Sequence, residues 1–217
     1  LINRKVFHIH IPRTGGRFVK ELFLLNNYLV EHFEFDKTFN FKDVGHLTFP
    51  DHDIYFGHMI CKKFAIVRDP VDRFLSAIKS DSKLNQETID YIFTNEQNFK
   101  NFVSTTIFND SCNWYTPQIN FLDFETKIYK YEAIQHNLKS DYFVKFNKGT
   151  LLSSFRYFKY ENGLDNNFSK WLLDNFEFDI IMKDYVHTDR NRNIELNEKQ
   201  KNFVKNYYFK DYKLLDY

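Results

Sequence analysis

The stretch VFHIHIPRTGGRF, residues 6–18, decides the fold of this 217-residue chain. Its first half is rich in apolar residues that favour a strand, and Pro12 marks the end of that run. The pair Gly15-Gly16 follows. Residues without a Cβ suit a backbone that must turn sharply and approach another group closely. The stretch therefore predicts a strand followed by a tight loop.

A helix is predicted directly after this loop, beginning at about Gly16. Apolar residues recur at i, i+4 and i+7 from Phe18, which is the spacing of one helix face. The N–H groups of a helix N-terminus attract anions, and Arg13 and Arg17 add positive charge on either side of the glycines. The pattern favours a phosphate site over the alternative, an ordinary strand-to-helix connection with solvated arginines.

This loop differs from the phosphate loop of nucleoside triphosphatases. That loop has the pattern G-x-x-x-x-G-K-[ST], in which the lysine contacts phosphate and the hydroxyl binds magnesium. Here Arg17 and Phe18 follow the second glycine, so the lysine and the hydroxyl are both missing. A P-loop-like nucleotide kinase is therefore only a weaker alternative.

Residues 64–78 predict a second strand-to-helix unit. The run Phe-Ala-Ile-Val at 64–67 is apolar throughout, as in a strand buried on both faces of a parallel sheet. Asp69 and Pro70 then form a helix start, with the carboxylate as N-cap and the proline in the first turn.

The helix of this second unit is amphipathic. Its apolar residues, Val71, Phe74, Leu75 and Ile78, share one face and leave Arg73 and Ser76 together on another. Arg68 ends the preceding strand, where parallel α/β sheets bind ligands. We therefore expect Arg68 and Ser76 to converge on one ligand.

Composition limits the classes of function. With 43% hydrophobic residues, the chain can form one α/β domain, which we expect to span residues 1–217. A net charge of +1 argues against a nucleic-acid coat protein, and no apolar run is long enough for a membrane span. Cys61 and Cys112 form no disulfide framework or zinc motif, which indicates a cytoplasmic protein.

No metal site is expected from the sequence. His8 and His10 lie on the same face of the predicted strand, but further ligands at metal-binding spacing are missing. We expect both histidines to be packed or hydrogen-bonded, and activity to survive a chelator.

Both motifs resemble those of sulfotransferases. The first is similar to the 5'-phosphosulfate loop, P-K-T-G-G-T-[ST]: Pro12, Thr14, Gly15 and Gly16 match, whereas Arg13 replaces the lysine and Arg17 and Phe18 replace the hydroxyl residues. The second, V-R-D-P-x-x-R-x-x-S, resembles the family's 3'-phosphate motif. The resemblance implies that residues 13–18 bind the 5'-phosphosulfate and that Arg68 and Ser76 bind the 3'-phosphate.

His58 is the candidate general base. Gly57-His58 resembles the Gly-His pair of glycan 2-O-sulfotransferases, in which that histidine is the base. We expect a short strand at residues 53–56 to precede it. His32, His46 and His52 lie upstream and compete for the role.

The resemblance implies a single α/β domain of the P-loop-like sulfotransferase fold, with a central, mainly parallel sheet flanked by helices. Its co-substrate would be 3'-phosphoadenosine 5'-phosphosulfate (PAPS), and its reaction the transfer of a sulfuryl group to an acceptor hydroxyl, with Arg13 stabilising the leaving phosphate. A saccharide or glycan acceptor is expected, with small phenols or alcohols as the alternative. A catalytically silent nucleotide- or glycan-binding module also remains open.

Away from these motifs, helices are predicted at residues 85–93 and 96–107 from their apolar spacing. Near the C-terminus, Asn197 followed three residues later by Gln200 is typical of a capping box, so a further helix is expected to begin there.

Overall fold

The computed structural model describes residues 1–32, 38–57, 59–109, 112–123, 125–130, 141–143, 155–158, 164–181, 185–188 and 193–217. Its helices are α1 (Gly16–Leu25), α2 (Phe49–Phe56), α3 (Pro70–Ser80), α4 (Gln86–Ile92), α5 (Glu96–Asn109), α7 (Leu164–Phe176), α8 (Glu198–Tyr207) and α9 (Phe209–Leu215), with short 3-10 helices η1 (Val44–His46) and η2 (Gln118–Phe121). Its strands are β1 (Val6–Ile9), β2 (Thr38–Phe39), β3 (Lys42–Asp43), β4 (Lys62–Val67), β5 (Lys127–Lys130), β6 (Asp141–Phe143), β7 (Phe155–Phe158) and β8 (Tyr185–Thr188).

A parallel sheet of three strands, in the order β1-β4-β5, lies at the centre of the fold. Val6 pairs with Lys62 and Ile9 with Ala65, so β1 and β4 run in register. Parallel strands end at the same edge of a sheet, and the loops that follow β1 and β4 therefore meet there. The α/β class with a parallel sheet flanked by helices is confirmed.

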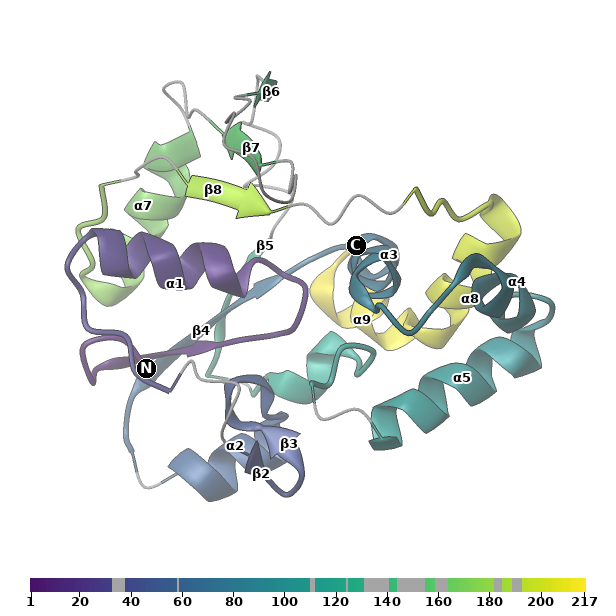
Figure 1. Cartoon of the computed structure of the whole chain (residues 1–217). Helices are drawn as coiled ribbons and strands as arrows, with labels where there is room; N and C mark the ends of the chain where they lie inside the picture. The colour runs from purple at the N-terminus through teal and green to yellow at the C-terminus, as the bar shows by residue number, and fades with distance from the viewer. Residues whose placement is uncertain are drawn as a thin grey trace.

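Both faces of β4 are buried, as its continuous apolar run predicts. Phe64 and Ile66 pack into a core shared with α1 and α7, whereas Ala65 and Val67 pack into a core shared with α2, η1 and η2. Figure 1 shows α1 and α7 on one side of β4 and α2 on the other. The alternation follows from the period of two residues in a strand.

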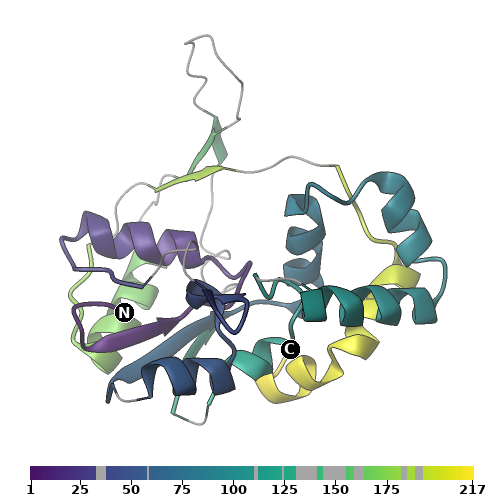
Figure 2. The same cartoon turned by 60° about the horizontal axis from the view of Figure 1, so that its bottom comes forward.

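A third core lies beside the sheet and joins α3, α4, α5 and α8. Figures 1 and 2 show these helices gathered at one end of the sheet, with the loop between β1 and α1 extending toward α3. Helix α3 begins as predicted, because the Asp69 carboxylate accepts hydrogen bonds from the backbone N–H groups of Val71 and Asp72. The predicted capping box of Asn197 and Gln200 at the start of α8 is also confirmed.

One predicted element is wrong. Residues 53–56 belong to helix α2 and not to a strand. Pro50 occupies the first turn of this helix, where its missing N–H group costs nothing. His52 and Phe56 are four residues apart and both pack against Phe7, so they share one helix face. The helical spacing of these two buried rings outweighs the short strand-like pattern.

Two smaller sheets complete the described structure. Strands β2 and β3 form an antiparallel pair, and β6, β7 and β8 form an antiparallel sheet in that order. Among the helices in the described part of the chain, none is long and apolar enough to cross a membrane.

Candidate functional site

The loop after β1 is held in a backbone conformation that few residues adopt. Gly15 has a φ of 96° and Arg13 a φ of 70°, so both lie in the left-handed region. Thr14, between them, is fully buried, and its hydroxyl donates a hydrogen bond of 2.8 Å to the carbonyl of Ile11. This inward bond fixes the turn and directs the loop backbone toward the N-terminus of α1.

Helix α1 starts at Gly16, as predicted, and no side chain caps its N-terminus. Its first-turn N–H groups have no acceptor within the helix, so they suit an anion. The imidazole of His10 packs against the backbone of Gly16 so closely that a Cβ on Gly16 would lie 1.9 Å from His10 Nε2. Glycine is therefore required here for the close approach of the ring of His10, the residue that follows β1.

The structure brings together Arg13, Arg68 and Ser76. Arg13 donates hydrogen bonds from Nε and Nη2 to Ser76 Oγ at 3.2 and 2.9 Å. Arg68 Nη1 lies 3.5 Å from the carbonyl oxygen of Arg13. All three side chains are half-buried beside the N-terminus of α1. The two motifs thus form one cluster of positive charge at the carboxyl edge of the sheet.

The indole of Trp114 lies next to this cluster. The guanidinium carbon of Arg13 is 5.6 Å from the centre of its ring, within the range of a cation–π contact. Arg13 therefore lies between a hydroxyl acceptor and an aromatic face, and both contacts favour its charged, planar guanidinium.

Arg73 shares a face of α3 with Ser76, as predicted, but its burial is unexpected: only 2% of the residue is exposed. Its guanidinium donates from Nε to the carbonyl of Pro12 at 2.9 Å and from Nη2 to the carbonyl of Trp114 at 3.1 Å. Burial lowers the pKa of Arg73, and the nearby Tyr208 and Asp211 oppose that effect. Arg73 therefore joins the loop between β1 and α1 to the segment that carries Trp114.

Gln118 is a second positioning residue that sequence reasoning missed. Its side-chain amide accepts from the N–H group of Arg68 at 3.0 Å and donates to the carbonyl of Arg68 at 2.7 Å. The buried carboxylate of Asp211 in turn accepts hydrogen bonds from the N–H groups of Gln118 and Ile119. The conformation at the end of β4 is thus fixed from α9, a relation that no local pattern reveals.

The remaining residues predicted for the loop have different environments. Phe18 is buried and packs against Phe168, so only its backbone can face a ligand. The side chain of Thr14 is turned inward, as described above, whereas Arg17 is exposed to solvent. Residues 14–18 therefore offer main-chain N–H groups and one exposed guanidinium.

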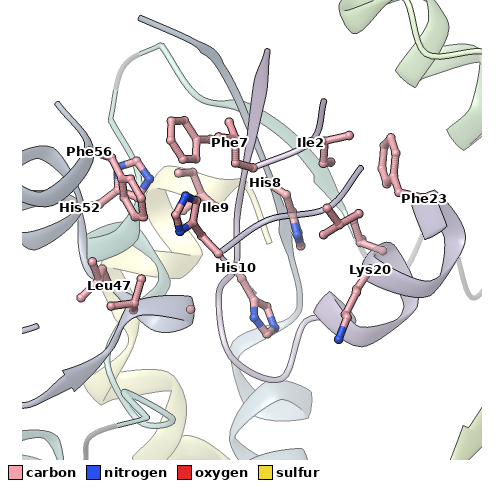
Figure 3. Close-up of a pocket in the computed structure, with 16 residues that line it drawn as sticks. Ile2, Phe7, His8, Ile9, His10, Lys20, Phe23, Leu47, His52 and Phe56 are labelled. Carbon is pink, nitrogen blue, oxygen red and sulfur yellow. The ribbon is translucent and has the colours of Figure 1, made fainter. Parts of the chain in front are cut away.

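A pocket between β1, α1 and α2 is lined by several histidines (Figure 3). In it the imidazoles of His8 and His10 stack with ring centres 5.8 Å apart, and Lys20 lines the same pocket. Burial lowers the pKa of His8 to about 3 and holds that of His10 well below its usual value. Both rings are therefore neutral at pH 7, and the expectation that they are packed is confirmed.

The competing histidines differ in their access to solvent. His46 and His52 are buried, and burial lowers the pKa of His52 to about 4. His32 is exposed. His58, the predicted base, lies outside the described residues, two positions after the pocket residue Phe56.

One further cluster could hold a cation. Asp43, His46 and Cys112 have ligand atoms within 4.8 Å of one another. Sequence reasoning missed it because Cys112 lies 69 residues from Asp43. The expectation of no metal site considered only ligands close in sequence.

The arrangement can bind an anionic group with several phosphate oxygens. Arginine guanidinium groups and first-turn N–H groups are the donors that proteins use for phosphates. The buried side chains of Arg73 and Gln118 hold the main chain at Pro12 and Arg68, next to these donors. Little reorganisation is therefore needed when charge develops on a bound ligand.

The model of the sulfotransferase family matches residues 3–217 of the chain. Neither the curated proteins nor the solved structures gave a match. The family match thus covers both motifs and the helices that support them.

We expect Gly16→Ala to destabilise the protein and His10→Ala to relieve that cost, because the added methyl group would overlap the His10 ring. In the double variant the two changes should couple by about 0.5–3 kcal/mol. Urea denaturation of the wild type, both single variants and the double variant measures the coupling. Strictly additive effects would show that the packing of His10 is not the reason why position 16 requires glycine.

Proposed function

This chain belongs to the sulfotransferase family, and on that premise we propose that it transfers the sulfuryl group of PAPS to a hydroxyl of a saccharide or glycan. The observation that carries the proposal is the cluster of Arg13, Arg68 and Ser76 at the N-terminus of α1. PAPS has two phosphate-bearing ends, and two motifs that meet at one sheet edge suit such a ligand.

In this proposal Arg68 and Ser76 bind the 3'-phosphate. The Ser76 hydroxyl accepts its hydrogen bonds from Arg13. Its own hydrogen can therefore be donated to a phosphate oxygen without breaking those bonds. Gln118 fixes the main chain of Arg68 on both its N–H and carbonyl sides, which supports a role in positioning that guanidinium.

The 5'-phosphosulfate binds at the loop and the first turn of α1. During transfer, negative charge accumulates on the oxygen that bridges sulfur and the departing phosphate. Main-chain N–H groups and the Arg13 guanidinium stabilise that charge, and such preorganised donors contribute a few kcal/mol each. Arginine keeps its proton at neutral pH, so Arg13 acts by charge and hydrogen bonding. The step requires no metal ion.

The acceptor oxygen loses its proton as it attacks sulfur, and we assign that proton to neutral His58. Two observations support this choice over two of the competing histidines: His46 and His52 are buried, and burial lowers the pKa of His52 to about 4. A histidine with an ordinary pKa near 6.5 is well suited to general-base catalysis at neutral pH. A sugar hydroxyl is barely acidic and depends on such a base.

Arg68→Ala should weaken binding of 3'-phosphoadenosine 5'-phosphate by about 10-fold to 100-fold, because a charge-assisted hydrogen bond contributes about 1.5–3 kcal/mol. Adenosine 5'-phosphate, which lacks the 3'-phosphate, should lose little. Isothermal titration with both nucleotides measures the difference. Arg4→Ala, which removes a surface arginine paired with Glu31, is the matched control.

Equal losses for the two nucleotides would contradict the assignment of the 3'-phosphate to Arg68. ATP with magnesium serves as the third ligand, and preferential binding of ATP would favour the nucleotide kinase.

Arg13→Ala should lower kcat about 100-fold, because it removes a donor to the leaving phosphate. Arg13→Lys should retain most of the activity, since lysine is the residue of the family motif. Turnover of labelled PAPS measures both variants. An unaffected alanine variant would mean that Arg13 does not stabilise the transition state, and a wild type without turnover would favour the silent binding module.

His58→Ala should abolish transfer to oligosaccharides and leave the Kd for 3'-phosphoadenosine 5'-phosphate nearly unchanged. His32→Ala removes an exposed histidine and is the matched control. The assay compares oligosaccharides with simple phenols, which ionise near pH 10 and depend less on a base. Turnover confined to phenols and retained in His58→Ala would contradict both the base and the acceptor class.

A further inference from the structure

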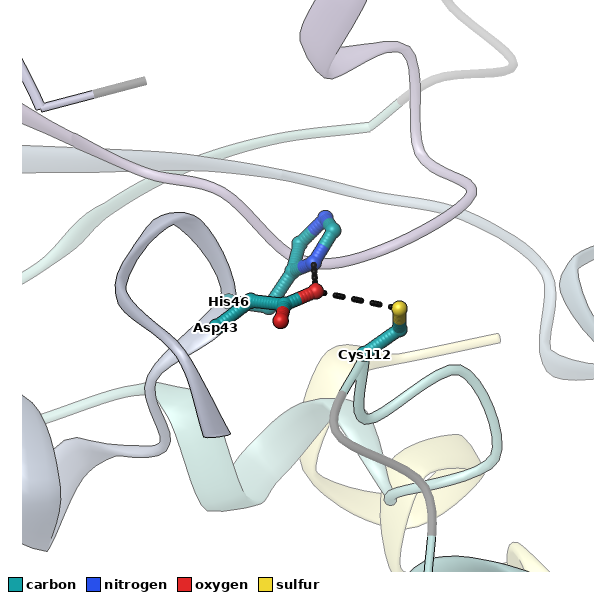
Figure 4. A group of neighbouring side chains, drawn as sticks. All are labelled: Asp43, His46 and Cys112. Atoms are coloured by element: carbon teal, nitrogen blue, oxygen red, sulfur yellow. Dashed lines mark hydrogen bonds and ion pairs between the residues drawn. The ribbon is translucent and has the colours of Figure 1, made fainter. Parts of the chain in front are cut away.

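We propose that Asp43, His46 and Cys112 bind one zinc ion beside the loop between β1 and α1. The three side chains converge from β3, η1 and the segment that follows α5, with their ligand atoms within 4.8 Å of one another. Figure 4 shows the Asp43 carboxylate lying between the imidazole of His46 and the thiol of Cys112. The site is separate from the sulfuryl-transfer residues and does not depend on the proposed function.

The spacing of the ligand atoms is close to that of a tetrahedral zinc site. Asp43 Oδ2 lies 3.0 Å from Cys112 Sγ and 3.7 Å from His46 Nδ1. With Zn–S of about 2.3 Å and Zn–N and Zn–O of about 2.0 Å, neighbouring ligand atoms lie about 3.3–3.5 Å apart. These two distances are within about 0.5 Å of the tetrahedral values, and the imidazole nitrogen and Cys112 Sγ lie within 4.8 Å of each other, so small side-chain movements would admit the ion.

The donor set selects the metal. Thiolate, imidazole and carboxylate together favour zinc over magnesium or calcium, which prefer oxygen ligands alone. Asp43 and His46 are 5% and 6% exposed, so the ion would be held mostly away from solvent. Three protein ligands leave the fourth position for water.

The same geometry argues against a nucleophilic cysteine. A cysteine nucleophile needs its thiol proton to pass to a histidine base. Here the thiol donates its hydrogen bond to Asp43 Oδ2, at 3.0 Å. Zinc binding instead replaces this proton: the S–H bond breaks, the sulfur bonds to the metal, and the proton leaves to solvent.

The position of the site suggests its role. Zinc would cross-link Asp43 to Cys112, which is 69 residues further along the chain. The ring of His46 lies 4.6 Å from that of His10, centre to centre, and His10 packs against Gly16 at the start of α1. The ion would thus fix His46, and through His46 it would support His10 and the start of α1, without contacting the substrate.

The test begins with the metal-free wild-type chain. Titration with Zn²⁺ against a chromophoric chelator should show one high-affinity ion per chain and a rise in Tm. Co²⁺, used as a spectroscopic probe, should give a thiolate-to-cobalt charge-transfer band together with the intense visible bands of tetrahedral cobalt. A wild-type cobalt complex without the thiolate band would overturn the proposal, and this result needs no variant.

Two substitutions locate the ion. Cys112→Ser should weaken Zn²⁺ binding at least about 100-fold and remove the charge-transfer band, because it deletes the thiolate ligand. Cys61→Ser should change neither, since Cys61 contacts the carbonyl of Arg4 elsewhere in the fold. Binding that survives in Cys112→Ser, or that is lost in Cys61→Ser, would contradict the site.

Discussion

The hydrogen bonds of the buried Arg73 guanidinium are the interaction on which the site depends. One guanidinium holds the carbonyls of Pro12 and Trp114, which belong to the loop between β1 and α1 and to the segment after α5. If Arg73 were lost, the buried carbonyl of Pro12 would be left without this partner, at a cost of about 1–3 kcal/mol. Lysine could not replace it, because only the planar guanidinium presents several donors in fixed directions.

This constraint explains how a strained loop persists. Arg13 adopts a left-handed conformation that is unfavourable for a residue with a Cβ, and such strain is retained only where the surroundings impose it. The neighbouring carbonyl of Pro12 is bound by Arg73, and the side chain of Thr14 is bound to Ile11. In this conformation the Arg13 side chain reaches Ser76 of the second motif.

Electrostatics makes the same region receptive to anions. Arg13, Arg68 and Arg73 gather at one edge of the sheet, and the charge of Arg68 contributes to lowering the pKa of Arg73. Like charges at close range repel one another in the absence of ligand. A bound anion would relieve this repulsion, so part of its binding free energy would come from charges that the fold has already placed. Neighbouring histidines add no charge, because burial holds His8 and His10 neutral at pH 7.

The sequence by itself determined the elements that short-range rules control. The strand-loop-helix of residues 6–25 and the buried strand with its Asp69-capped helix follow from apolar spacing, glycine placement and capping, all of which act within a few residues. It also indicated that Arg68 and Ser76 would converge on one ligand, because Arg68 follows a strand and Ser76 lies two turns into the helix that comes next.

Only the tertiary structure decided the rest. Arg73 is buried, and Gln118 forms hydrogen bonds with the main chain of Arg68. His10 packs against Gly16, and Asp43 contacts Cys112. Each of these contacts depends on segments that the fold brings together. Helix α2 replaced a predicted strand for the same reason, since the packing of His52 and Phe56 on Phe7 outweighs a weak local preference.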